Sequence, residues 1–115
     1  MQAEVLATFP TGASASLMVL GDDQGSTVIT LDTSRKLVIV NATSQGNRDV
    51  RAGPLPEATG SSHTLHLYLD HSIIELIVDN QTAMVVYAAP SSGTGNVRSS
   101  AGSVDVWALK DANQI

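Results

Sequence analysis

Short runs of alternating hydrophobic and polar residues, separated by turn residues, extend along most of the chain. Such alternation places every second side chain on one face of an extended strand. No segment of ten or more residues keeps its apolar positions at helical spacing. Strands are expected at residues 4–9, 16–20, 26–31, 36–40, 64–70, 73–78, 82–88 and 103–109. The pattern therefore predicts an all-β protein.

The number and spacing of these runs are typical of an antiparallel two-layer β-sandwich. Residues 41–62 are the least regular part of the chain and predict a long connection, because they contain Gly46, Gly53, Pro54, Pro56 and Gly60. The length of 115 residues is that of one ordinary domain. We therefore treat residues 1–115 as a single β-sandwich domain.

Two of the expected strands carry apolar residues on both faces. Leu65, Leu67 and Leu69 alternate with polar residues, as in a strand with one buried face, but residues 73–78 and 83–87 do not alternate. Either loops, such as the long connection, cover the second face, or another domain or copy of the chain does. The second alternative predicts a homo-oligomer, most simply a dimer.

Charge narrows the range of partners. The net charge of −5 arises from 11 acidic and 6 basic residues, a balance that disfavours nucleic acid and anionic membranes. The basic residues are scattered and form no stripe: Arg35, Lys36, Arg48, Arg51, Arg98 and Lys110. No apolar run approaches the roughly 20 residues that cross a bilayer, so membrane insertion is not expected.

The absence of cysteine excludes a disulfide framework, a thiol nucleophile and a cysteine-ligated metal. Two sequons, at Asn41 and Asn80, are predicted N-glycosylation sites and favour a secreted, extracellular protein. Polar Gln2 directly follows Met1, so no signal peptide is visible. In a secreted protein, Met1 would stand where a leader had been removed.

The most informative segment is residues 65–80, which contains two tight turns. At the first, the Asp70 carboxylate can accept the backbone N–H of Ser72. At the second, Asn80 tolerates the left-handed backbone that such turns need. This segment resembles the C-terminal β-sandwich module of glycoside hydrolase family 32, the group of invertases, inulinases, levanases and fructosyltransferases. The matching residues are Asp70, Ser72 and Glu75, then the Asp79–Asn80 turn, then Pro90.

The resemblance extends to both ends of the chain. Residues 3–9 look like the opening strand of the module, and residues 102–109 like its closing strand with a characteristic Trp107. Two departures indicate a diverged member: Leu76 or Ile77 stands where the family usually has an aromatic residue, and Gln81 stands where it has glycine. The resemblance implies a concanavalin-like or lectin-like jelly roll. It also implies a non-catalytic protein, because catalysis in the family belongs to a separate propeller domain.

The sequence gives little support for a catalytic or a metal site. Asp70 and Glu75 could form the carboxylate pair of a retaining glycosidase, but nothing in the chain predicts a cleft, and the turn accounts for Asp70. His63, His66 and His71 lack an obvious carboxylate partner and are interpreted as surface residues instead of metal ligands. Ser61 and Ser62 lack the strained elbow of a nucleophile. No catalytic residue, metal or cofactor is predicted.

Sugar binding is the better hypothesis, although the chain has only one Trp, two Tyr and one Phe. Tyr68 and Tyr87 are the candidate platforms for a sugar face, with His66, Asp70 and Glu75 as polar partners, while Trp107 is assigned to the core. These five residues form the predicted ligand site.

The sequence thus favours a free-standing secreted sandwich that acts by self-association and by weak, lectin-like recognition of carbohydrate or of a cell-surface receptor. A defence or immune-modulating role fits such ligands. The alternative is an accessory or dimerisation domain excised from an enzyme that hydrolyses fructan or sucrose.

Overall fold

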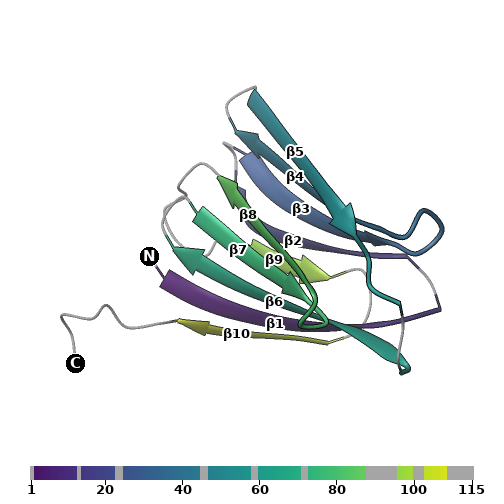
Figure 1. Ribbon diagram of the computed structural model, residues 1–115. Helices are drawn as coiled ribbons and strands as arrows, with labels where there is room; N and C mark the ends of the chain where they lie inside the picture. The colour runs from purple at the N-terminus through teal and green to yellow at the C-terminus, as the bar shows by residue number, and fades with distance from the viewer. Residues whose placement is uncertain are drawn as a thin grey trace.

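Two five-stranded antiparallel sheets lie face to face in the computed structural model of the chain (Figure 1). The structure describes residues 2–12, 14–22, 25–44, 47–57, 60–70, 73–87, 96–99 and 103–108. At positions 2–3, 20–22, 25, 44, 47, 70, 87, 96–99 and 103–108 it describes the backbone alone. The predicted all-β, two-layer sandwich is confirmed, and the described residues contain no helix.

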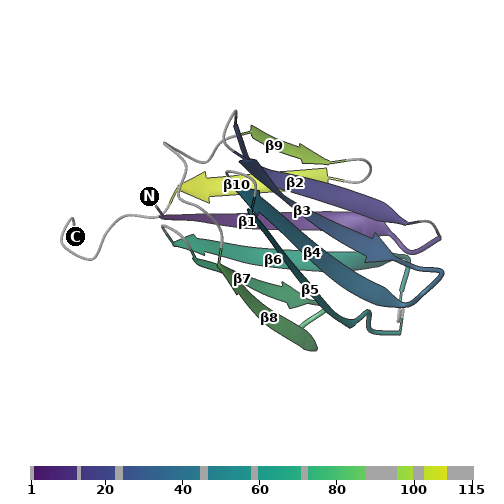
Figure 2. The same ribbon diagram turned by 90° about the horizontal axis from the view of Figure 1, so that it is seen from above.

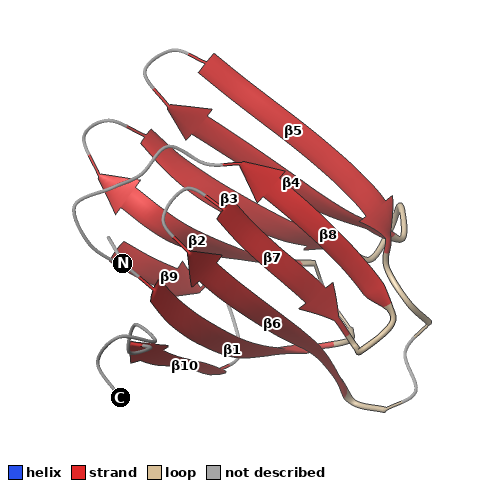
Figure 3. Ribbon diagram, turned by 60° about the vertical axis from the view of Figure 1, so that its left-hand side comes forward, coloured by secondary structure: helices blue, strands red, loops and turns tan. Residues whose placement is uncertain are grey.

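The first sheet, called sheet A, has the strand order β10-β1-β6-β7-β8 (Figure 3). Its strands are β10 (Ser103–Ala108), β1 (Gln2–Pro10), β6 (Ser62–Asp70), β7 (Ile73–Val78) and β8 (Thr82–Tyr87). The second, sheet B, has the order β5-β4-β3-β2-β9. Its strands are β5 (Asn47–Pro54), β4 (Leu37–Ser44), β3 (Gly25–Asp32), β2 (Ala15–Asp22) and β9 (Asn96–Ser99). Viewed from above, the two layers cross each other with β6 near the middle of sheet A (Figure 2).

The core lies between the sheets and follows directly from the alternation. On β6, Leu65, Leu67 and Leu69 are buried, whereas His66 and Tyr68 between them are half-buried on the outer face. The strands β1, β6, β7 and β8 supply their inward residues in register with one another. The remaining large members of the core include Val5, Phe9, Leu17, Val19, Ile29, Leu31, Val38, Val40, Ile74, Leu76, Val78 and Val86. Hydrophobic burial of this size is the main force that holds the two sheets together.

Hydrogen-bonded turns fix the register of the hairpins. Asp79 and Asn80 both have positive φ, 51° and 56°, as a two-residue hairpin turn requires, which confirms the turn expected there. In the β3–β4 turn, one Asp32 carboxylate oxygen accepts the backbone N–H groups of Ser34 and Arg35. The Arg35 side chain, 2.7 Å from the other oxygen, and these bonds hold the pKa of Asp32 well below its usual range.

The interpretation of residues 41–62 as a long connection was wrong. Most of this stretch belongs to β4 and β5, which pair from Leu37↔Pro54 to Ser44↔Asn47. Half of the residues of β5 are polar or charged, because this strand forms an edge of sheet B, where alternation is weak and a terminal proline such as Pro54 is tolerated. The strand β9 was missed for a related reason, since it is four residues long and includes Arg98 at its centre.

The strands β7 and β8, which carry apolar residues on both faces, have outer faces that are exposed to solvent. Burial alternates along β7, and on the outer face Ile73 is 36% and Val85 52% exposed. On the inner side, β8 approaches β5 so closely that a side-chain carbon at Gly53 would lie 3.3 Å from the Met84 sulfur. The expected long connection does not cover these strands, because β4 and β5 lie in the opposite sheet. Within the described residues there is no helix long and apolar enough to cross a membrane.

Candidate functional site

The backbone register places the predicted ligand residues in three alternate rows of the sheet A ladder. Tyr68 on β6 lies opposite Glu75 on β7, and His66, two residues before Tyr68, lies opposite Ile77. Asp70 lies opposite Ile73, which in turn lies opposite Tyr87. The backbone of all five predicted residues therefore gathers in one region. The side chains of Asp70 and Tyr87 lie outside the described residues.

Two aromatic rings stack in this region. The centroids of the His66 and Tyr68 rings lie 4.6 Å apart, and their planes are inclined by 29°. Glu4, on the neighbouring strand β1, forms a hydrogen bond with Nε2 of His66 and lies in the same ladder row as Tyr68. The carboxylate therefore fixes the orientation of the imidazole. We call Glu4, His66, Tyr68 and Glu75 the outer platform.

The outer platform combines flat apolar surface with hydrogen-bond acceptors. The side chains of His66 and Glu4 are each 28% exposed, and Glu75 is exposed beside them on β7. A stacked ring pair offers a rigid face, since the Glu4 bond removes the rotation of one ring. The two carboxylates can accept hydrogen bonds from hydroxyl or amino groups. This set of groups suits a neutral ligand with many hydroxyls better than an anion.

His63 and His66 do not lie together, which corrects their interpretation as residues without carboxylate partners. The two lie on opposite faces of β6, since His63 is 3% exposed and His66 is half-buried on the outer platform. Nδ1 of His63 lies 2.6 Å from Oδ2 of Asp79, and His66 bonds to Glu4. Each of these two histidines thus has its own carboxylate. His71 and Ser72 lie outside the described residues, as does the predicted hydrogen bond from the Ser72 N–H to Asp70.

Sequence reasoning missed the pairing of His63 with Asp79, although one signal pointed to it. His63 has the same parity as Leu65, Leu67 and Leu69, so the alternation of β6 directs its side chain inward. A buried imidazole requires a hydrogen-bond partner, and the turn after β7 supplies one.

The remaining predicted sites are only partly described. Asn80 is exposed in the β7–β8 turn, whereas Asn41 is half-buried within β4. In the backbone ladder Trp107 lies opposite Glu4, and its side chain, which was assigned to the core, lies outside the described residues. Among the described residues, no three histidine or acidic side chains converge as metal ligands would.

Comparison with known proteins decides the family. The family described as "Glycosyl hydrolases family 32 C terminal" matches residues 1–112. The chain belongs to this family. The family 32 C-terminal module is the non-catalytic domain of these hydrolases. No curated protein is significantly similar to the chain in sequence.

Solved structures share the fold of this family 32 module. An exo-inulinase of Aspergillus awamori matches 95% of the chain with a TM-score of 0.78 and 14% identity, and the match spans a quarter (25%) of the inulinase. A galectin of Caenorhabditis elegans matches 91% of the chain and 77% of its own length, with a TM-score of 0.66 and 21% identity. A carbohydrate-binding module of Bacillus subtilis matches 93% of the chain and 66% of its own length, with a TM-score of 0.59 and 10% identity. These matches establish a galectin-like β-sandwich.

Proposed function

We propose that this family 32 module is a non-catalytic domain that binds carbohydrate weakly through the outer platform of sheet A. The observation that supports the proposal is the stacked His66–Tyr68 pair with carboxylates on either side. A sugar presents a face of C–H groups, which packs on an aromatic ring, and a rim of hydroxyls, which donate to carboxylates. The platform supplies both kinds of contact within three adjacent strands.

The platform is prepared for binding in the free protein. Glu4 holds the His66 ring, and Tyr68 lies against that ring at 4.6 Å, so little side-chain freedom is lost when a ligand stacks. The Tyr68 hydroxyl has no hydrogen-bond partner among the described residues and is available to a ligand. The net charge of −5 favours a neutral glycan over an acidic one. Two neighbours with this fold are a galectin and a carbohydrate-binding module, which is consistent with such a role.

The substitution Tyr68→Ala tests this proposal. It is expected to weaken binding of inulin or levan by about fivefold to tenfold, because an aromatic contact contributes about 1 kcal/mol beyond its buried area. Calorimetric titration of the wild-type protein and the variant with each fructan measures the change. Tyr68→Phe is the matched control, since it keeps the ring and should retain most of the affinity. Unchanged binding by a folded Tyr68→Ala variant would contradict the proposal.

Exposed apolar residues favour a second function, self-association or docking to another domain. Ile73 and Val85 lie on the outer face of β7 and β8, beside the platform, and are 36% and 52% exposed. In an accessory domain of a fructan-hydrolysing or sucrose-hydrolysing enzyme, such residues would contact the partner domain. In a secreted, free-standing chain they would contact a second copy or a cell-surface receptor, and a defence or immune-modulating role fits this placement.

Multi-angle light scattering distinguishes self-association from a monomeric state. For a homodimer, the mass is expected to be twice 12.0 kDa and to fall to that of a monomer in Val85→Lys, which places a charge in the contact. Val50→Lys is the control. Val50 is 47% exposed on the other sheet, so this substitution should not change the mass. A wild-type protein that stays monomeric at high concentration would exclude self-association.

A further inference from the structure

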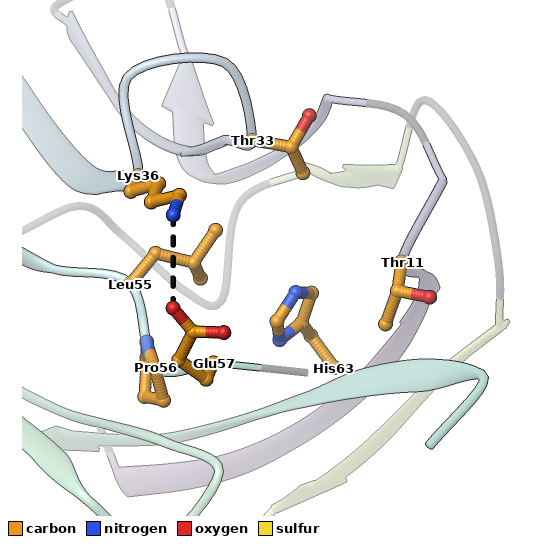
Figure 4. A pocket seen from close by; sticks show the side chains of 7 residues that line it. All are labelled: Thr11, Thr33, Lys36, Leu55, Pro56, Glu57 and His63. Carbon is orange, nitrogen blue, oxygen red and sulfur yellow. Dashed lines mark ion pairs between the residues drawn. The ribbon is translucent and has the colours of Figure 1, made fainter. Parts of the chain in front are cut away.

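A hollow at one end of the sandwich lies apart from the outer platform. Its volume is about 190 Å³. Its walls come from the end of β1, the β3–β4 turn, the segment after β5 and the start of β6 (Figure 4). The lining side chains are Thr11, Thr33, Lys36, Leu55, Pro56, Glu57 and His63. We call this space the end pocket.

Backbone hydrogen bonds hold the walls of the end pocket in place. The N–H of Leu55 donates to the Lys36 carbonyl at 3.0 Å, and the N–H of Thr11 donates to the Ser61 carbonyl at 3.1 Å. The first bond joins the segment after β5 to the β3–β4 turn, and the second joins the end of β1 to the start of β6. The fold therefore holds the walls of the pocket in place before a ligand binds.

His63 directs its second ring nitrogen into the end pocket. Its Nδ1 lies 2.6 Å from Oδ2 of Asp79, whose other oxygen accepts the N–H of Thr64 at 2.7 Å. The Asp79 oxygen accepts this bond, so Nδ1 is its donor, and in the tautomer that carries the proton on Nδ1 the other nitrogen, Nε2, is an acceptor. Nε2 has no partner among the described residues and points into the pocket (Figure 4). The His63 side chain is only 4% exposed, and no buried side-chain nitrogen or oxygen among the described residues lacks a partner. Nε2 therefore reaches solvent through the pocket, and a ligand bound there would take the place of solvent.

The charges of the pocket favour a neutral ligand. Lys36 Nζ lies 3.6 Å from Glu57 Oε1, longer than a hydrogen bond, and both side chains are largely exposed (Figure 4). Glu57 thus balances the positive charge of Lys36, and the Asp79 carboxylate lies beside His63. An anion therefore gains little electrostatic attraction in the pocket. Such a loose pair offers one donor and one acceptor side by side, which matches two neighbouring hydroxyls of a polyol.

Size and apolar surface limit the ligand further. A volume of about 190 Å³ is smaller than that of ordinary pockets for drug-sized molecules, so a single ring fits better than an oligosaccharide. Leu55, which is 9% exposed, and Pro56 supply apolar contacts for the C–H groups of such a ring. The hydroxyls of Thr11 and Thr33 add groups that donate or accept.

We propose that the end pocket is a second site of this chain and binds one ring of a neutral polyol or sugar. In this site His63 Nε2 accepts a ligand hydroxyl, and the Lys36–Glu57 pair binds two neighbouring hydroxyls. The site is independent of the outer platform, because no residue is shared between the two.

The experiment is a titration of the full chain with D-fructose, followed in long-range nitrogen–proton NMR spectra of the histidine rings. The Nε2 signal of His63 is expected to shift in a saturable way, and sodium sulfate should not produce this shift. Glu57→Gln is expected to raise the dissociation constant by about fivefold or more, because a charged acceptor is lost. Glu75→Gln, the same chemical change on the outer platform, should leave the His63 titration unchanged.

Three results would overturn the proposal: a His63 signal that fructose does not shift, a larger saturable shift with sulfate, or equal effects of the two glutamate substitutions. Both variants change exposed residues, so the fold is retained in each. The His66 signal is followed in the same spectra and measures occupancy of the outer platform. Failure of the end pocket and failure of the platform can therefore be told apart.

Discussion

Leu67→Ala is expected to lower the free energy of unfolding by about 3–5 kcal/mol, the largest effect of any single substitution considered for this domain. Leu67 is fully buried in β6, the middle strand of sheet A. In the ladder it lies between Val5 on β1 and Leu76 on β7, both of which are buried. Since two paired strands hold the backbone on either side, the space left by the lost side chain cannot collapse.

Urea denaturation of the two proteins, followed by circular dichroism, measures this loss. Val50→Ala is the control, because Val50 is 47% exposed on the other sheet, away from the proposed contact surface, and its truncation should cost less than about 0.5 kcal/mol. A loss for Leu67→Ala as small as that of the control would show that the two sheets do not pack around β6 as described.

Asp79→Ala is expected to cost about 2–4 kcal/mol, because one short side chain has three roles. It accepts from the buried His63 ring at 2.6 Å and from the Thr64 N–H at 2.7 Å. It also occupies a left-handed backbone position, with φ 51°, which alanine adopts poorly. Removal of the carboxylate leaves the His63 nitrogen without a partner inside the sandwich, which adds the cost of an unsatisfied polar group.

Asn80→Ala separates these contributions. Asn80 follows Asp79 in the same turn with φ 56°, but its side chain is exposed, so its substitution should cost only about 1 kcal/mol of backbone strain. Thermal unfolding of both variants under the same conditions gives the comparison. Equal losses would show that the turn conformation alone, and not the bond to His63, accounts for the role of Asp79.

Strands with a clear run of apolar residues could be predicted from the sequence, including β8 and β10 at the edges of sheet A, whereas the edge strands β5 and β9 of sheet B could not. The alternation of Leu65, Leu67 and Leu69 predicted the inner face of β6, and the bounds of β7 at residues 73–78 were predicted correctly. In β5 the pattern fails, because an edge strand pairs on one side only and need not bury apolar side chains. Its glycine and proline residues then resemble those of a loop.

Part of the candidate site could be predicted because a hairpin is local. The short connection between Asp70 and Ile73 sets Tyr68 opposite Glu75, so these two residues are neighbours by register. The bond between His66 and Glu4 joins residues that lie far apart in the sequence, and it depends on the pairing of β1 with β6. Nothing in a single sequence specifies that pairing. The end pocket combines four separate segments of the chain, and it was not predicted.

The position of β1 has a consequence for how the domain folds. This strand lies between β10 and β6, so that Val5 pairs with Val106 on one side and with Leu67 on the other. Both pairings require long segments of chain to close into loops before any contact forms, and such non-local contacts slow folding to milliseconds or longer. During synthesis on the ribosome, β1 leaves the exit tunnel before the other strands of this domain, and its sheet is complete only when β10 has followed. Until then one edge of β1 stays open to a neighbouring chain, and the last strand protects the domain from aggregation.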